Sequence, residues 1–163
     1  MAARRMKTFW TSLPSLSLRA DYGLTRRIIL ANVRDIEGIG EVSATKLEGA
    51  GVHTEAQLLT TGATKKGRDE LATKTGLSEH NIYKWVKMCD MNRVKGIGPQ
   101  TAEVLLACGV DTVAELAHRN GEHLHAKMVE VNTAKNLSNH LPSAHQMEQY
   151  INEAKTLPKV IVT

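Results

Sequence analysis

The residues Ile36-Glu37-Gly38-Ile39-Gly40-Glu41 return 58 positions later as Val94-Lys95-Gly96-Ile97-Gly98-Pro99. The stretches 36–59 and 94–117 align without a gap and are identical at ten of 24 positions. A duplication at a fixed spacing typically means that a structural unit has been copied. The sequence therefore predicts two similar units within this chain of 163 residues.

Each Gly-Ile-Gly segment predicts a very short turn between two helices. Glycine adopts positive φ angles without steric cost, so the chain can reverse in few residues. The isoleucine between the glycines is expected to point into the core and hold the turn in place. The second glycine precedes a helix whose first amides lack intrahelical partners, and these amides with the helix dipole favour a phosphate. The alternative is that the glycines only permit a tight turn.

Residues typical of helix ends divide both units into short helices. Glycine ends a helix in the left-handed conformation, and a threonine or serine side chain begins the next one. The expected elements are a helix from Thr25 to about Val33, helices that stop at Gly51 and Gly109, capping boxes at Thr54–Gln57 and Thr112–Glu115, a helix over about 65–74 ended by Gly76, a helix over 79–90 capped by Ser78, and a last helix capped by Ser143. A strand is suggested only at Lys159–Val162.

The predicted fold is all-α, with two tandem repeats of about five short helices each that share a central helix. The expected boundaries are a basic arm or extension at 1–23, a first repeat at 24–90 and a second repeat at 91–163. Aromatic residues make up only 4% of the chain, so Leu, Ile, Val, Ala and Met must build the core. Trp85 and Tyr150 take equivalent, core-facing positions, because the last helix matches the helix 79–90 at an offset of 65 residues.

Cysteine content and apolar runs exclude two classes of protein. Cys89 and Cys108 are too few for a disulfide framework, and both are expected to be buried thiols in a reducing compartment. No apolar run approaches the roughly 18–20 residues that a membrane-spanning helix needs.

The net charge of +4 is concentrated near the N-terminus. Residues 1–34 carry +6, residues 35–90 carry −2, and residues 91–163 are neutral. Such an asymmetry is typical of an arm that contacts a partner. The candidate contacts of the arm are Arg4, Arg5, Lys7, Trp10 and Arg19. The same composition is also typical of a transit peptide, which would place the protein in an organelle matrix.

At the two glycine turns the chain resembles the helix-hairpin-helix superfamily, which is SAM-like in fold. Its signal is Gly-hydrophobic-Gly with an alanine four residues after the second glycine, and Ala44 and Ala102 meet it. Over roughly residues 30–157 the chain more closely resembles a bacterial-type family of tandem helix-hairpin-helix proteins that is described as a domain of unknown function. That likeness includes the segments Ala50-Gly51-Val52-His53-Thr54, Gly62-Ala63-Thr64-Lys65-Lys66-Gly67-Arg68 and Leu124-His125-Ala126-Lys127.

The superfamily resemblance implies sequence-independent contact with the phosphate backbone of DNA or RNA. The implied nucleic-acid contacts are Gly96, Gly98, Lys95, Thr101 and Arg93 at the second turn, and Gly38 and Gly40 at the first. Gln100 replaces a basic residue that often follows the proline in that superfamily. The first turn departs further, because Glu37 flanks it and Glu41 begins its helix, where a carboxylate repels phosphate.

Two other groups of residues suggest binding chemistry. Lys65-Lys66-Gly67-Arg68 opens a helix and could contact a phosphate, or could be a solvated helix end. His118, His123 and His125 lie close together, but no second pair with zinc-like spacing accompanies them, so no metal site is expected.

The sequence offers no paired carboxylates, nucleophile and base, or nucleotide-binding loop. We therefore expect a protein that is not an enzyme and has no cofactor. The predicted function is binding of nucleic acid, with DNA favoured over RNA, through the second turn and the arm. The expected location is cytoplasmic, at the nucleoid if the ligand is DNA. The alternative function is a protein-protein adaptor or a structural subunit of a larger assembly.

Overall fold

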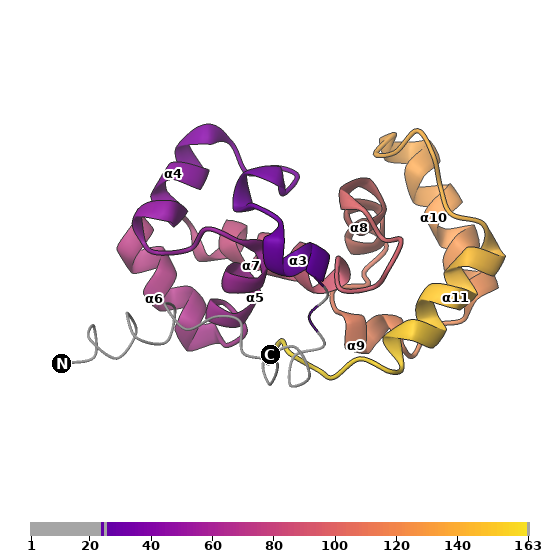
Figure 1. Cartoon of the computed structure of the whole chain (residues 1–163). Coiled ribbons are helices and arrows are strands. Elements are labelled where there is room, and N and C mark those ends of the chain that lie inside the picture. The colour runs from indigo at the N-terminus through magenta and orange to yellow at the C-terminus, as the bar shows by residue number, and fades with distance from the viewer. Residues whose placement is uncertain (1–23, 25, 163) are drawn as a thin grey trace.

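The computed structural model describes Leu24 and residues 26–162, and this part of the chain is all-helical, as predicted (Figure 1). Its elements are α3 (Arg26–Leu30), the 3-10 helix η1 (Val33–Asp35), α4 (Glu41–Gly49), α5 (Glu55–Thr61), α6 (Lys65–Thr75), α7 (Glu79–Met91), α8 (Pro99–Ala107), α9 (Val113–Leu116), α10 (Gly121–Lys135) and α11 (Ala144–Ala154). The first helix is shorter than predicted, because Asn32 caps η1 instead of continuing α3. None of these helices has the length and apolar character needed to cross a bilayer.

The two Gly-Ile-Gly segments form tight turns of the same geometry. In each, the amide of the isoleucine donates to the carbonyl three residues earlier, at 3.1 Å for Ile39 and 3.2 Å for Ile97. Gly38 and Gly96 have φ angles of 83° and 96°, which only glycine adopts without strain. Ile39 is 9% exposed and Ile97 is fully buried, so the predicted burial of both isoleucines is confirmed.

An aromatic side chain packs against the first glycine of each turn. A Cβ placed on Gly38 would lie 3.7 Å from the indole nitrogen of Trp85, on α7. A Cβ on Gly96 would lie only 2.9 Å from the ring of Tyr150, on α11, whose hydroxyl donates to the Gly96 carbonyl at 3.3 Å. The first turn therefore packs against α7, and the second turn packs against α11.

The predicted helix caps form within the described residues, with one difference between the two capping boxes; the predicted cap residue Thr25 lies outside the described residues. Thr54 and Gln57 make a full capping box. Thr112 accepts from the Glu115 amide, but the Glu115 carboxylate accepts from the Asp111 amide at 2.8 Å, so the second box is incomplete. The remaining predicted ends are also found: Ser78 and Ser143 cap α7 and α11, and Gly51, Gly76 and Gly109 have positive φ angles.

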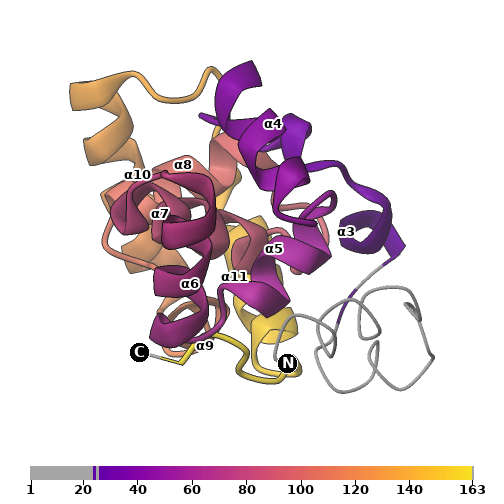
Figure 2. The same cartoon turned by 90° about the vertical axis from the view of Figure 1, so that its left-hand side faces the viewer.

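Buried apolar side chains form two clusters. One collects residues between Leu24 and Cys89 together with Val160 and Ile161, and the other collects residues between Met91 and Ala154. Helix α7 packs against α5, α6 and α8, so it lies between the helices of the first half and those of the second (Figures 1 and 2).

The segment after α11 returns to the first half of the chain (Figure 1). Val160 and Ile161 are 7% and 1% exposed and belong to the first cluster. The Val162 amide donates to the Ala63 carbonyl at 2.8 Å. This corrects two predictions: residues 159–162 are not a strand, and they pack with the first unit although the sequence places them in the second.

We expect Ile161→Ala to lower the free energy of unfolding by about 2–5 kcal/mol, the usual cost of a large-to-small change in a core. The matched control is Val162→Ala, because Val162 is 55% exposed and its replacement should cost about 0.5 kcal/mol or less. Urea denaturation of both variants measures the difference. Equal, small losses would show that the returning segment contributes nothing to the first cluster.

A buried polar network at the C-terminal end of α7 connects the two halves of the chain. The Arg93 guanidinium donates to the Asp90 carboxylate at 2.7 Å and to the Pro158 carbonyl at 2.6 Å. The other oxygen of Asp90 accepts from the Val113 amide at 2.8 Å. Arg93 is fully buried and Asp90 is 2% exposed, and burial raises the pKa of the Asp90 carboxyl. The network thus links α7, α9 and the returning segment.

Candidate nucleic-acid interface

Helix α8 begins at the second glycine turn without a side-chain cap. Gly98 is its N-cap residue and Pro99 its first residue. Helix α4 also lacks a side-chain cap, whereas every other α-helix whose preceding residue is described has one. Because Pro99 has no amide hydrogen and Ala102 donates to the Gly98 carbonyl, the amides of Gln100 and Thr101 have no partner within the helix.

The backbone of the second turn is accessible from outside. A Cβ on Gly98 would meet no heavy atom within 4 Å, and the side chain of Lys95 is exposed. Gly96 is exposed and Thr101 is partly buried at the start of α8. The structure thus brings four of the five predicted contacts of this turn together at one exposed site.

Arg93, the fifth predicted contact, does not reach this surface. Its side chain is fully buried and bonded to Asp90 and Pro158. The prediction of Arg93 as a phosphate contact is therefore wrong. Its position two residues before Lys95 offers no sign of this burial, because the partner atoms come from α7 and from the segment after α11.

The structure adds Glu153 to the second turn. Its carboxylate accepts from the Lys95 amide at 3.0 Å. Glu153 lies on α11 three residues after Tyr150, so the same helix contacts the turn twice. The sequence could not reveal this contact, because it depends on how α11 docks against the turn.

The first turn has a different electrostatic character. Gly40 is as open as Gly98, but the exposed Glu41 begins α4 and pairs with Arg34 at 2.6 Å. Arg34 also pairs with Glu48 at 2.8 Å. Glu48 and Glu41 raise the pKa of the Arg34 guanidinium, and Arg34 lowers the pKa of the Glu48 carboxyl. The arginine nearest to this turn is therefore held by two carboxylates.

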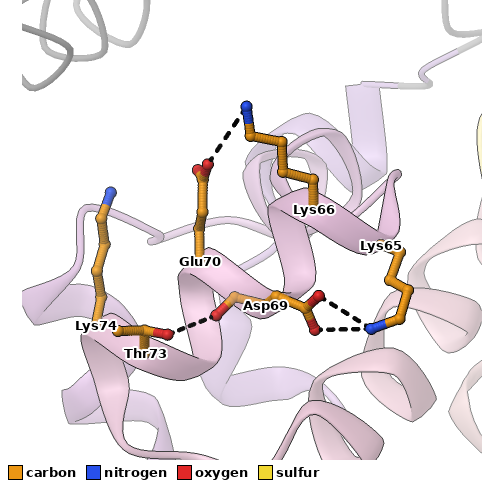
Figure 3. A pocket seen from close by; sticks show the side chains of 6 residues that line it. All are labelled: Lys65, Lys66, Asp69, Glu70, Thr73 and Lys74. Carbon is orange, nitrogen blue, oxygen red and sulfur yellow. Dashed lines mark hydrogen bonds and ion pairs between the residues drawn. The ribbon is translucent and has the colours of Figure 1, made fainter.

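The lysines at the start of α6 are paired with carboxylates on the same helix. Lys65 donates to Asp69 at 2.9 Å, and Lys66 lies 4.0 Å from Glu70, as Figure 3 shows. These lysines line a shallow surface hollow together with their partners. This arrangement is that of a solvated, ion-paired helix start, the alternative reading of the segment.

Arg68, in the same segment, has a structural role. It donates to the Glu79 carboxylate at 3.0 Å and to the Gly62 carbonyl at 2.9 Å. Its guanidinium lies 4.0 Å from the centre of the Tyr83 ring, and the residue is 3% exposed. Arg68 therefore fixes the contact between α6 and α7 and is not exposed to a ligand.

The remaining candidate residues are placed as follows. Among the described residues, no group of three or more His, Cys, Asp and Glu side chains is arranged to hold a metal ion. The His125 ring lies 2.9 Å from the Pro142 carbonyl. Cys89 is buried as predicted, but Cys108 is only partly buried. The predicted arm residues Arg4, Arg5, Lys7, Trp10 and Arg19 lie outside the described part of the chain.

A comparison with known protein families gives a match. A family model with the description "Domain of unknown function (DUF4332)" matches residues 37–157. A search of curated proteins and a search of solved structures each returned no match.

Proposed function

The chain belongs to the DUF4332 family, and we propose that it binds the phosphate backbone of nucleic acid through its second Gly-Ile-Gly turn. We propose further that its halves are two tandem helix-hairpin-helix repeats that share α7. The matching positions of α4 and α8 relative to their turns, and of Trp85 and Tyr150 against the first glycines, support this arrangement.

The observation that carries the proposal is the uncapped start of α8 beside an exposed lysine. A phosphate oxygen placed over Gly98 would accept from the amides of Gln100 and Thr101, with the helix dipole favouring its charge. Lys95 would add a cation on the other side of the turn. Because backbone phosphates are the same at every nucleotide, these contacts would carry no sequence preference.

In this proposal the first turn does not hold a phosphate. Gly40 leaves the backbone equally open, but the Glu41 carboxylate stands at the start of α4. A negative side chain at that end satisfies the helix dipole and repels a phosphate. The two turns would therefore share a geometry and differ in function.

We expect binding of the full chain to a generic duplex to weaken as salt rises, since each neutralised phosphate releases about 0.9 counterion. Deleting residues 1–23 should reduce the slope of log K against log salt, because the arm carries much of the net positive charge. Fluorescence anisotropy with duplex DNA, single-stranded DNA and RNA measures both slopes and the preference. An unchanged slope would remove the arm from the interface, and no binding to any of the three at low salt would reject the proposal.

A protein-protein adaptor is the second candidate, and the first turn favours it. Val42 is 69% exposed there, next to the exposed Glu41 and five residues after the exposed Glu37. An apolar side chain flanked by carboxylates suits a partner protein better than a phosphate. In neither candidate function does the protein act as an enzyme.

A further inference from the structure

A small basic pocket lies at the end of α8 opposite to the second glycine turn. Its volume is about 320 Å³, within the range of small-molecule sites. The lining residues are Cys108, His118, Arg119, Asn120, His123, Leu124 and Lys127. Four of them are basic and none is acidic, so the wall of this pocket carries only positive charge.

Arg119 and Lys127, the permanently charged residues of this pocket, form only weak interactions with other protein groups. Arg119 donates to the Gly109 carbonyl at 3.4 Å, a long hydrogen bond that uses one of the five donors of a guanidinium. Lys127 pairs with Glu130 at 3.2 Å, but the two side chains are 50% and 71% exposed, and exposed pairs contribute little. Both cations can therefore turn to a ligand at small cost.

Helix α10 begins at the pocket, but the Glu148 carboxylate at its first amide and Glu122 in its first turn offset its dipole. Its first amides already have partners, because Asn120 accepts from the His123 amide and Glu148 accepts from the Gly121 amide. The attraction for an anion must therefore come mainly from the side chains. Burial raises the pKa of the Cys108 thiol, Lys127 lowers it, Glu130 raises it, and Lys135 and Arg119 lower it, so both lining cations act on the thiol.

Two other surface hollows on the described residues are not basic in this way. In the hollow on α6, Lys65 and Lys66 lie beside Asp69 and Glu70 (Figure 3). The groove between α7 and α8 also has lining carboxylates: Glu103 lies 4.0 Å from Lys84, and Asp111 lies 3.6 Å from Lys87. Lining cations without lining carboxylates thus distinguish the pocket beside Cys108 from both of these hollows.

We propose that this pocket binds a phosphomonoester dianion. Arg119 matches two phosphate oxygens with its forked N–H groups, and Lys127 supplies the second positive charge. The ring nitrogens of His118 and His123 add hydrogen-bonding groups on the same wall. The cavity is larger than a phosphate, so it leaves room for the sugar of a nucleotide. The site is separate from the second turn and does not depend on the function proposed there.

Cys108 provides a direct reporter for this site. The chain has two cysteines, and Cys89 is fully buried, so iodoacetamide should alkylate only Cys108 in the folded protein. We expect adenosine 5′-monophosphate to slow this alkylation, by about tenfold when its concentration is tenfold above Kd. Adenosine, and sodium chloride at matched ionic strength, should give no protection. Mass spectrometry follows the reaction, and an unchanged rate with the nucleotide at millimolar concentration would overturn the proposal.

Charge-removing variants test whether the basic side chains form the site. Arg119→Gln with Lys127→Gln should abolish protection, measured as the ratio of rates with and without nucleotide for each variant. Lys127→Gln alone should weaken it several-fold, and it leaves the Arg119 bond to Gly109 in place. The matched control, Lys65→Gln with Lys66→Gln, removes the same charge from the hollow on α6 and should keep full protection. Full protection in the first double variant, with an unchanged circular dichroism spectrum, would contradict the proposal.

Two further measurements identify the source of the phosphate. A short DNA strand with a 5′-phosphate is compared with the same strand without it. Protection by the phosphorylated strand well beyond that of the mononucleotide would identify a strand end as the ligand, and equal protection would identify a small phosphate ester. Lys95→Glu should leave protection by the mononucleotide unchanged, so failure of the turn as a nucleic-acid site is distinguishable from failure of this pocket.

Discussion

Replacing Arg93 by methionine is expected to lower the free energy of unfolding by about 3–5 kcal/mol, the usual loss when one partner of a buried ion pair is removed. The change leaves the buried Asp90 carboxylate bonded to the Val113 amide without its cation, and it removes the bond to Pro158. Urea denaturation at constant pH measures the loss. Because the network joins both halves, the variant should also show weaker coupling between them, seen as a broader or biphasic transition.

Two further variants separate the buried charge from lost packing. Adding Asp90→Asn to Arg93→Met removes the uncompensated charge and keeps an oxygen for the Val113 amide, so part of the stability should return. The control is Lys65→Met, which breaks the exposed pair with Asp69 and should cost about 1 kcal/mol or less. A loss below about 1 kcal/mol for Arg93→Met would show that the network does not hold the halves together.

Those parts of the fold that depend on neighbouring residues could be predicted from the sequence. Gly38 and Gly96 take positive φ angles because their turns require it, and the isoleucines that follow them are buried. The caps at Thr54, Ser78 and Ser143 form because a hydroxyl reaches an amide three residues on. Each of these outcomes is decided within a few residues of chain.

Those parts that depend on distant contacts could not be predicted. Nothing in the sequence distinguishes Arg68 and Arg93 from the exposed Lys95, yet both arginines are buried and bonded to groups from other elements. Ile161 packs in the first cluster because the chain returns after α11, which no local pattern signals. Glu153 at the second turn was missed for the same reason. Four of the five predicted contacts therefore lie together at the second turn, but the positive charge expected from Arg93 is not exposed there.

The second large effect is expected at Lys95. Lys95→Glu replaces an exposed cation three residues before Gly98 with a carboxylate, so the second turn would carry a negative side chain as the first turn does at Glu37 and Glu41. We expect nucleic-acid affinity to fall about tenfold, or about 1.4 kcal/mol, for all sequences tested. Because Lys95 is exposed, stability should change by about 0.5 kcal/mol or less.

Glu41→Lys makes the opposite charge change at the first turn, at the position equivalent to Pro99. It removes the carboxylate from the start of α4 and adds a cation next to the open Gly40, while Arg34 keeps its pair with Glu48. If the shared geometry of the turns is what receives a phosphate, this variant should bind nucleic acid several-fold more tightly than the wild type. An adaptor would show no gain.

The most direct test of the central proposal is a binding isotherm for Lys95→Glu at low salt, measured with a generic duplex beside the wild type. Lys46→Glu is the matched control, because it makes the same charge change at an exposed site on α4. Our account predicts about a tenfold loss for Lys95→Glu and a clearly smaller loss for Lys46→Glu, both with the wild-type circular dichroism spectrum. Wild-type affinity for a folded Lys95→Glu, or equal losses in both variants, would contradict phosphate binding at the second turn.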